Sequence, residues 1–507
     1  MEKRPQRSGG RSSRQKLRAS KGKTPNPAPP GQKGGQYRPL SDADIDQIIT
    51  AALNLLDTLG MGEVPPRLAE LFLSKGAERR DDGRITFPLS LTEDTIALAA
   101  RKFVLHGRDP DRSIEVGGDS VHFGTGGAAV QTLDLETGTY RPSTLQDLYD
   151  FTRLQDQLQN VSWFTRCCVA TDIPDNFDLD VNTVYALLCG TTKPVATSFT
   201  LAEHVAPIVA MLDIAEGGDG RFSARPFVKA HISPVISPMR FGEDAVDVTY
   251  ACIEHNIPLS CITAAQAGAT APATLAGFLV QSLAETLASL LMVNLIRPGY
   301  PMVFSNWPLV IDLRTGAFSG GGGETALLNA ASAQLSNALG LPSGVASSMT
   351  DAKAIDAQYG AEKGITALAA GLAGGNLIYE SSGMTAALLG ASFEAFLLDN
   401  DMHSAIYRTL RGIEVNDDTI ALEHIEHAIL GDGHFLGQDQ TIAAMERDYV
   451  YPVLANRDPP VTWDETGRMT IWQNANQRAR EILAQYHPEY LDTKCATKIK
   501  EKFKIYL

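Results

Sequence analysis

The sequence lacks the patterns by which metal-binding, nucleotide-binding and disulfide-bonded proteins are usually identified. Its six cysteines form no CxxC pair and no framework spacing, so neither a disulfide scaffold nor a cysteine-rich zinc site is indicated. No Walker sequence, no GxGxxG between a strand and a helix, and no HxExxH-like pair is present. We therefore expect no metal centre.

Two weaker features remain after these exclusions. Gly320–Gly323 follows an expected strand, but the Lys and Ser/Thr of a phosphate loop are missing. The run could form an anion-binding nest, although a lid or tight turn is the simpler interpretation. His424 and His427 are three residues apart on an expected helix and could share a metal, but no third ligand is evident.

Long apolar runs are also missing. No stretch reaches the roughly 18 apolar residues that a membrane span needs. The most apolar one, 275–296, is interrupted by Gln281, Ser282, Glu285 and Asn294, which is typical of a buried helix. No secretory apolar region follows the start, so we expect a cytoplasmic location and no membrane partner.

Charge is distributed unevenly along the chain. The formal net charge is −15, yet residues 1–36 contain ten Lys/Arg and one Glu. The segment is rich in Gly, Ser and Pro, which predicts a disordered basic tail over residues 1–38. Contact with nucleic acid or an anionic partner is one interpretation of such a tail. A solubilising extension is the other, and we expect no nucleic-acid partner.

What the sequence does contain is a repeated alternation. Short β-branched runs that end in polar residues alternate with long Ala/Leu-rich helical patterns. Strands that are apolar on both faces and separated by helices predict a parallel sheet. Eight units over about 250 residues predict a (β/α)8 TIM barrel. The expected strands are 128–133, 162–170, 194–199, 226–232, 258–262, 301–304, 344–347 and 376–380.

The expected organisation has four parts. The disordered tail (1–38) is followed by N-terminal helices and a β-meander packed on the barrel (39–125). The barrel covers 126–412, and a C-terminal helical extension covers 413–507. In such a barrel the active site lies at the C-terminal ends of the strands. The polar and aromatic residues there are therefore the candidates for function.

Several segments, taken in order, resemble the trimethylamine methyltransferase family. The resemblance spans roughly residues 40 to 485 and rests on the order of the motifs more than on any one of them. The motifs are Asp134–Gly138 (DLETG) with Arg141, Thr192–Pro194 (TKP), Leu339–Pro342 (LGLP), Thr350–Lys353 (TDAK), Asp356–Gln358 (DAQ), Asn376–Met384 (NLIYESSGM), Leu398–Met402 (LDNDM) and Gly433–Gly437 (GHFLG).

The resemblance implies a barrel enzyme that moves a methyl group from a methylated amine to a cognate corrinoid protein. The founding archaeal members carry pyrrolysine near strand seven, and Met349 stands approximately at that position here. Methionine cannot form the amine adduct attributed to pyrrolysine, which favours a quaternary donor such as glycine betaine over trimethylamine. The implied partner is a corrinoid-binding protein, and no cofactor is expected to bind tightly to this chain itself. Whether the chain forms a homo-oligomer stays open.

The residue types at the strand ends suit such a reaction. A permanent cation is best held by aromatic faces, and a betaine carboxylate needs hydrogen-bond donors. Glu380 and Asp351 are the candidate catalytic residues, for electrostatic stabilisation or contact with the corrinoid partner. The candidate substrate-binding residues are Trp163, Phe199, His231, Gln266, Ser305, Asn306, Trp307 and Tyr359.

Other functions stay open at this point. A tertiary methylamine could be the donor in the same fold. A metal-assisted lyase or hydrolase would need a carboxylate and histidine cluster at the strand ends, and no consistent set is visible. A barrel that binds a betaine without transferring its methyl group is the non-enzymatic alternative.

Overall fold

The computed structural model describes residues 26–431 and 433–507, so most of the predicted basic tail lies outside the described residues. At its centre is a curled sheet of nine strands, eight of them parallel. The eight are β6 (Ser120–Phe123), β9 (Phe164–Thr165), β10 (Val195–Thr197), β11 (Val228–Ile232), β14 (Leu259–Thr263), β16 (Met302–Asn306), β19 (Ser343–Ala346) and β20 (Leu377–Tyr379).

The two edges of this curled sheet approach each other. Gly124, directly after β6, forms an isolated parallel bridge with Trp163, directly before β9. The backbone N–H of Ser162 donates to the carbonyl of Phe123 over 2.9 Å. A side chain at Gly124 would clash with the Trp163 ring, so this approach requires glycine.

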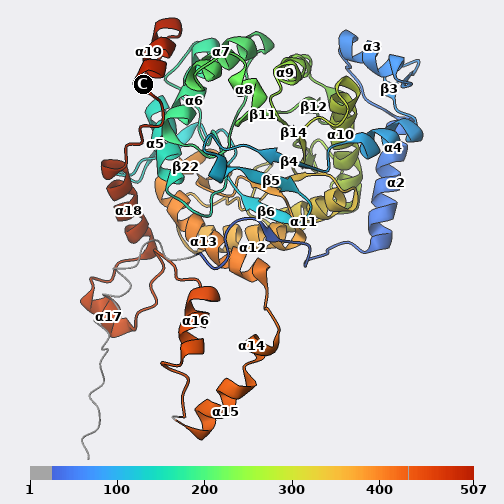
Figure 1. The fold of residues 1–507 in the computed structure, drawn as a ribbon. Coiled ribbons are helices and arrows are strands. Elements are labelled where there is room, and N and C mark those ends of the chain that lie inside the picture. Colours follow the sequence, from blue (N-terminus) through green and yellow to red (C-terminus); the bar gives the residue numbers. More distant parts are fainter. Residues whose placement is uncertain (1–25, 432) are drawn as a thin grey trace, which may run out of the picture.

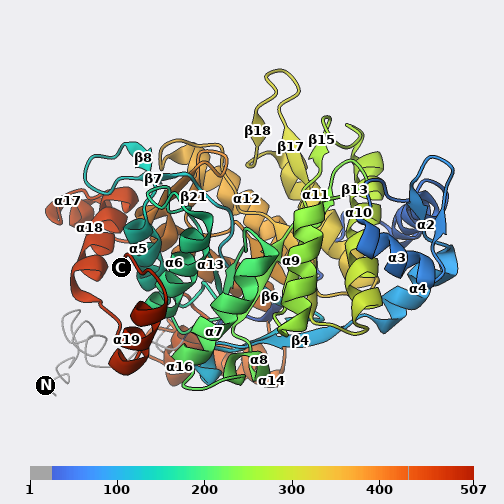
Figure 2. The ribbon, with the colours of Figure 1, turned by 90° about the horizontal axis from the view of Figure 1, so that it is seen from above.

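Helices cover the outside of the sheet, one after each strand (Figure 1, Figure 2). They are α5 (Leu145–Asp156), α6 (Asn176–Gly190), α7 (Val205–Ala215), α9 (Glu243–Glu254), α10 (Leu275–Ile296), α11 (Gly323–Ala338), α12 (Ala357–Ala373) and α13 (Phe393–Arg411). Of the described helices, α10 alone is long and apolar enough to cross a membrane, but 78% of its apolar window is buried in the protein. The prediction of a buried helix over 275–296 is therefore confirmed.

The first expected strand is wrong, whereas the other seven are confirmed. Ser120–Phe123 takes its place beside β20. Residues 131–133 belong instead to a separate sheet, because glycines at 124, 126 and 127 turn the chain out of the central one and Gly127 has a φ of +77°. That sheet contains β7 (Gln131–Leu133), β8 (Tyr140–Pro142), β21 (Met384–Thr385) and β22 (Gly390–Ser392).

Different elements cover the two ends of the central sheet. The hairpin of β4 (Lys102–Leu105) and β5 (Ile114–Gly117) crosses the end at which the strands begin (Figure 1). Its Leu105 and Val116 pack in one cluster with Val303 and Leu377. At the opposite end stand β15 (Gln266–Ala267), β17 (Leu309–Ile311) and β18 (Phe318–Ser319), at the top of Figure 2. The strands therefore end beneath β15, β17 and β18.

The N-terminal elements pack on α10 and on the start of the sheet. β1 (Gln32–Lys33) pairs antiparallel with β6, so residues 26–38 contain a paired strand where the sequence predicts disorder. A capping box of Ser41 and Asp44 begins the first long helix. The N-terminal group contains α2 (Asp42–Thr58), α3 (Pro66–Ser74), β2 (Glu78–Arg79), β3 (Ile85–Thr86), α4 (Leu89–Leu98) and the 3-10 turn η1 (Pro110–Arg112).

The C-terminal extension is helical. α18 (Ile471–Gln485) packs on α13 and α5, and α19 (Thr493–Lys502) packs on α7. Figure 1 shows another part of it extending away from the sheet. The remaining elements are α14 (Asp417–Ile420), α15 (Leu422–Leu430), α16 (Asp439–Arg447), α17 (Pro460–Glu465), α8 (Arg221–Ala224), η2 (Ala202–His204), β12 (Val235–Ile236) and β13 (Arg240–Phe241).

Candidate active site

Two neighbouring strands end in strained backbone. Ser348, two residues after β19, has a φ of +60°, and Glu380, directly after β20, has a φ of +63°. Both residues are fully buried. A left-handed conformation costs a residue with a side chain about 1–3 kcal/mol, and such strain concentrates at functional sites. The chemistry is therefore expected at this end of the sheet.

Four rings meet inside the curled sheet. We call Trp163, His231, Trp307 and Tyr379 the aromatic cluster. The ring centroids of Trp163 and Tyr379 lie 4.5 Å apart, and those of Trp307 and Tyr379 lie 4.9 Å apart. His231 stands edge-on to Trp307 at 5.3 Å. Met349 packs in the same buried cluster.

A buried lysine lies among these rings. The Nζ of Lys229 donates to the Tyr379 hydroxyl over 2.7 Å and lies 5.1 Å from the Trp163 ring and 4.7 Å from the Tyr379 ring. Ser260 links the Tyr379 hydroxyl (2.6 Å) to Ser305 (2.9 Å). Burial lowers the pKa of Lys229 to about 7, since little compensates the cost of a buried charge.

Several polar atoms of the aromatic cluster have no protein partner. Among the described residues, the indole N–H groups of Trp163 and Trp307 and the Nδ1 of His231 make no hydrogen bond. Burial, followed by the charges of Lys229 and Arg166, lowers the pKa of His231. Native proteins rarely leave buried donors unpaired, so these atoms point to a ligand.

Glu380 is the acidic group of the site. Its carboxylate is fully buried, and neither oxygen has a partner within normal hydrogen-bond geometry. A Cβ at Gly126 would lie 2.7 Å from Oε1, and one at Gly127 would lie 2.8 Å from Oε2, so the two glycines leave room for the carboxylate. Burial raises the pKa of Glu380 to about 8, against smaller opposing effects of the Gly127 N–H and Lys363.

Of the predicted residues, Trp163, His231, Ser305 and Trp307 come together at the aromatic cluster, and four others do not. Phe199 packs in the larger core outside it. Gln266 belongs to β15, beneath which the strands end. Asn306 points outward, because its Nδ2 donates to Ser282 of α10 over 3.3 Å. Tyr359 lies in α12, and its hydroxyl donates to Asp399 of α13 over 2.7 Å.

Asp351 serves as a loop anchor in this structure. Its carboxylate accepts from the Ser319 hydroxyl over 2.9 Å and from the Gly320 backbone N–H over 2.7 Å. A Cβ at Gly320 would lie 2.8 Å from the Cβ of Met349, so the anchored loop lies directly on that methionine. The glycine run therefore covers the site, in keeping with the expected lid or tight turn.

Tyr359 takes part in a buried network that supports the segment after β20. Lys363 and Asp399 form an ion pair of 2.9 Å with both side chains fully buried. The backbone N–H of Gly383 donates to the same carboxylate over 2.8 Å, and Lys363 donates to the Met384 carbonyl over 3.3 Å. Through these bonds the network fixes the chain that presents Glu380.

Replacing Lys363 by methionine should therefore destabilise the fold. Breaking a buried pair leaves an uncompensated charge, which costs about 3–5 kcal/mol of unfolding free energy. Denaturant unfolding measures the loss, and the double variant Lys363→Met/Asp399→Leu should recover much of it. Arg478→Met, which removes an exposed pair with Glu481, is the control and should change nothing measurable. A single-variant loss below about 1 kcal/mol would contradict the role assigned to this pair.

Lys229, Arg166 and Tyr379 are site residues that the sequence prediction missed. A signal for Lys229 was present, because it stands two residues before His231 in the same strand. Residues two apart in a strand share a face, so a candidate at one position implicates the other. No comparable pattern marks Arg166, which follows β9 in a loop.

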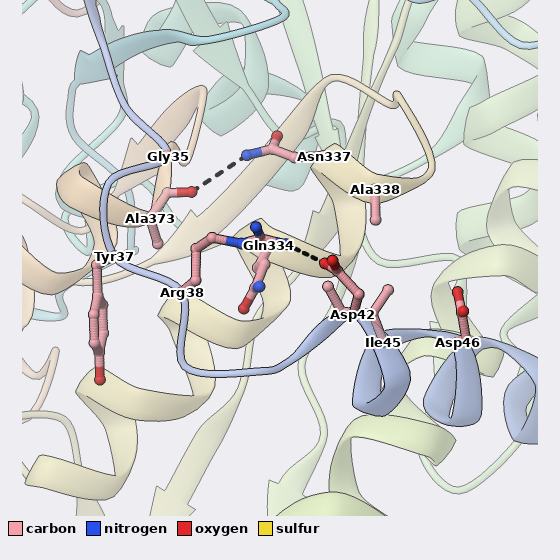
Figure 3. A pocket seen from close by; sticks show the side chains of 10 residues that line it. All are labelled: Gly35, Tyr37, Arg38, Asp42, Ile45, Asp46, Gln334, Asn337, Ala338 and Ala373. Carbon is pink, nitrogen blue, oxygen red and sulfur yellow. Dashed lines mark hydrogen bonds and ion pairs between the residues drawn. The ribbon is translucent and has the colours of Figure 1, made fainter.

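A large open pocket lies elsewhere (Figure 3). It has a volume of about 500 Å³ and lies between the N-terminal segment and the C-terminal ends of α11 and α12, beside Arg38, Asp42 and Asn337. Those helix ends are at the side where the strands begin, so this pocket is separate from the aromatic cluster. Among the described residues no group of three or more potential metal ligands occurs.

Comparison with known sequences identifies the family. The profile described as "Trimethylamine methyltransferase (MTTB)" matches residues 7–504. The chain belongs to this family. Glycine betaine methyltransferase of Desulfitobacterium hafniense (strain Y51) is 29% identical over 471 residues, 92% of this chain and 97% of that protein. Trimethylamine methyltransferase MttB of the same species (strain DSM 10664 / DCB-2) is 29% identical over 463 residues, 91% of this chain and 92% of that protein.

More distant similarities give less information. Trimethylamine methyltransferase MttB of Methanosarcina thermophila is 27% identical over 464 residues, 90% of this chain and 95% of that protein. Among solved structures, dihydropteroate synthase from Xanthomonas albilineans aligns with a TM-score of 0.35 and 12% identity, over 61% of this chain and all of that chain. Nothing is inferred from so low a score.

Proposed function

We propose that this methyltransferase moves a methyl group from a quaternary methylated amine to the cobalt of a corrinoid held by a separate carrier protein. Family membership supports methyl transfer from methylated amines. The observation that carries the quaternary donor is the aromatic cluster inside the curled sheet. Buried aromatic faces hold a permanent cation that has no hydrogen-bond donors.

The proposal includes a closed barrel. The eight parallel strands would form its wall, and the Gly124–Trp163 bridge supports closure between β6 and β9. The site would then lie inside the wall at the C-terminal ends of the strands, the usual place in this architecture.

Methyl transfer from a quaternary amine needs neither an acid nor a nucleophile from the protein. A quaternary ammonium already carries a neutral tertiary amine as its leaving group, so no general acid is needed. The carrier's reduced corrinoid supplies the nucleophile. This chain's residues bind the cation, exclude water and orient one methyl–nitrogen bond toward the mouth of the barrel, which is catalysis by positioning. Met349 presents an inert side chain where an adduct-forming residue would otherwise stand.

The charges around the aromatic cluster favour a zwitterionic donor. Lys229 would repel a simple cation held on the same rings, whereas it would attract a carboxylate on the same molecule. Arg166, His231 and the two indole N–H groups add donors for that anionic end. Glu380 would lie toward the ammonium. A betaine therefore fits these groups better than tetramethylammonium or trimethylamine.

A tertiary amine is the second candidate donor. Its leaving group is a secondary amine, which needs a proton. With a pKa of about 8, Glu380 is largely protonated at neutral pH and could supply one. The two candidates differ in the donor that the enzyme demethylates.

Methyl transfer to free cob(I)alamin tests the proposal. Glycine betaine, proline betaine, carnitine and trimethylamine would each be supplied, and the methylcob(III)alamin spectrum followed. We expect one betaine to react and trimethylamine to be inert. Reaction with trimethylamine alone would favour the tertiary donor. Silence with every donor, repeated with a cognate corrinoid protein, would leave a betaine-binding barrel without transfer activity.

The aromatic cluster has its own test. Trp307→Leu keeps an apolar side chain but removes the ring, and should weaken quaternary donor binding about 10- to 30-fold, since a desolvated cation–π contact is worth about 2 kcal/mol. Trp472, a partly exposed residue of α18, is the control, and Trp472→Leu should bind the donor normally. Isothermal titration gives both dissociation constants. Equal affinities in the two variants would remove Trp307 from the site.

A further inference from the structure

The C-terminal extension contains a segment that stands away from the rest of the protein. We call residues 413–453, which carry α14, α15 and α16, the arm. It leaves the protein at the end of α13 and extends from it at the bottom of Figure 1. Its short helices bury almost nothing: among the described side chains of α14, α15 and α16, only Ala428 is buried.

The arm is unusually apolar for an exposed segment. Every large hydrophobic side chain that is more than 70% exposed in the described residues lies in it. These are Ile413, Val415, Leu422, Leu430, Leu436 and Val453. At about 100 Å² per exposed aliphatic side chain, the six offer on the order of 450 Å² of apolar surface. Half-exposed Ile442, Phe435 and Tyr449 extend it toward the roughly 800 Å² per partner of a standard interface.

The base of the arm is fixed to the protein. Asp401 of α13 accepts from the backbone N–H groups of Val453 and Leu454 over 3.0 and 2.7 Å. Arg411 pairs with Asp448 over 3.2 Å, and Arg408 donates to the carbonyl of Asp448. The arm therefore projects from a base that hydrogen bonds and an ion pair fix to α13. Helices of nine residues or fewer are marginal without packing, so α14, α15 and α16 need a surface from outside.

The position of the base of the arm argues against the corrinoid carrier as the partner that covers the arm. α13 runs back from the segment after β20 and ends beside β1, where the strands begin. In Figure 2, α14 and α16 lie on the side of β4, opposite β15, β17 and β18. Under the proposed function, the carrier must reach the end at which the strands finish. A carrier docked there is on the wrong side to cover the arm.

Charge indicates what does cover it. Residues 413–453 contain nine acidic residues and one basic residue, whereas residues 1–36 of the same chain carry a net charge of +9. The first described residues lie at the base of the arm, where Arg411 donates to the carbonyl of Pro27 over 3.0 Å. Two acidic arms in contact would repel each other unless basic segments accompanied them. A second copy brings both the apolar surface and the opposite charge to the same place.

We propose that the arm is the contact surface between two copies of this chain, with apolar side chains at its centre and the basic N-terminal segments as counter-charge. The contact is isologous, because each copy offers the same acidic, apolar arm and the same basic segment. The exclusion of the carrier as the partner rests on the proposed function, but self-association itself can be measured without the methyl-transfer reaction, since the arm holds no residue of the site.

Sedimentation velocity of the full-length chain tests this proposal. The wild type should sediment at twice the mass of one chain or more. Leu430→Asp/Leu436→Asp places charges at the centre of the contact and should weaken self-association at least 100-fold. Both positions are more than 70% exposed within one copy, so the fold should survive, which circular dichroism checks. Ile365→Asp, on exposed α12 surface away from the arm, is the control and should keep the wild-type mass.

A second variant tests the counter-charge. Arg11→Gln/Arg14→Gln/Arg18→Gln leaves the arm intact and should weaken association and reduce its dependence on salt. A wild type that sediments as one copy overturns the proposal. Protected α15 amides in hydrogen exchange would then mean that residues 1–25 of the same chain cover the arm. Unprotected amides would leave the arm for a different protein.

Discussion

Glu380→Gln is expected to make the protein more stable and a poorer enzyme. The carboxylate is buried, no bond to it reaches normal hydrogen-bond geometry, and its pKa is raised from 4.5 to about 8. A raised carboxyl pKa contributes stability below pH 4.5, and that contribution is lost as the pH rises toward 8. At pH 7 the free energy of unfolding of the wild type is therefore roughly 3 kcal/mol lower than it would be with a neutral isostere at this position.

The gain from Glu380→Gln should follow pH in a defined way. It should be near zero at pH 4, grow between pH 4.5 and 8, and then level off. Denaturant unfolding at several pH values measures it. Glu285 is the matched control, because it is buried too but accepts from Ser237, the Met239 N–H and Gln281. Glu285→Gln should destabilise, since glutamine cannot accept at both positions in the same way.

The loss of function should appear in donor binding. A cation beside Glu380 favours its ionised form, so binding of tetramethylammonium, which has no carboxylate, should release a proton from the wild type near pH 7.5 and none from Glu380→Gln. Titration calorimetry in buffers with different ionisation enthalpies counts the proton. We expect the variant to bind a quaternary donor about 10- to 100-fold more weakly, the range for a lost charge-assisted contact. Unchanged affinity and proton release would place Glu380 away from the donor.

The sequence predicted most of the sheet because buried parallel strands have a strong pattern. Seven strands appear where apolar runs place them. The first strand was missed because Ser120–Phe123 is only four residues long and looks like part of the preceding β-meander. The deciding feature was the glycine-rich turn after it, whose role depends on contacts with Trp163 and Glu380.

The candidate site was predicted less well, for a reason that differs between strands and loops. Within strands the period of two decides direction, so Ser305 and Trp307 face inward while Asn306 faces α10. That rule was available from the sequence. For Asp351 and Tyr359 no local rule applies, because their partners Ser319 and Asp399 are 32 and 40 residues away along the chain. Only the folded structure brings them together.

Lys229→Met should separate betaines from simple cations. Lys229 has a pKa lowered to about 7, so it is half-protonated near neutrality. A donor carboxylate should raise that pKa again and draw a proton onto the amine as it binds. Without Lys229, a betaine should bind about 10- to 100-fold more weakly, the range for a charge-assisted contact. Tetramethylammonium, which has no carboxylate, should bind equally well or better.

Lys193 provides the matched control for this variant. It is also fully buried with a pKa lowered to about 7, but it donates to the carbonyls of Gln155, Leu158 and Val161 over 2.7–2.8 Å. Lys193→Met leaves three carbonyls unpaired, so it should lower stability and leave donor affinity unchanged. Lys229→Met should raise stability most below about pH 7, and the gain should fade as the pH rises from 7 to 10.5, because a lysine with a lowered pKa costs stability wherever the unfolded chain would protonate it.

Proton counting connects Lys229 with Glu380. A betaine held between them should release a proton from Glu380 and bind one at Lys229, so the wild type should exchange almost none with the buffer. Lys229→Met should then release a proton on binding the betaine, and Glu380→Gln should take one up. Tetramethylammonium should cause release from the wild type and from Lys229→Met alike. A betaine that binds both Lys229→Met and the wild type with equal affinity and equal proton release would show that no carboxylate contacts Lys229, and the donor would then be a simple methylated amine.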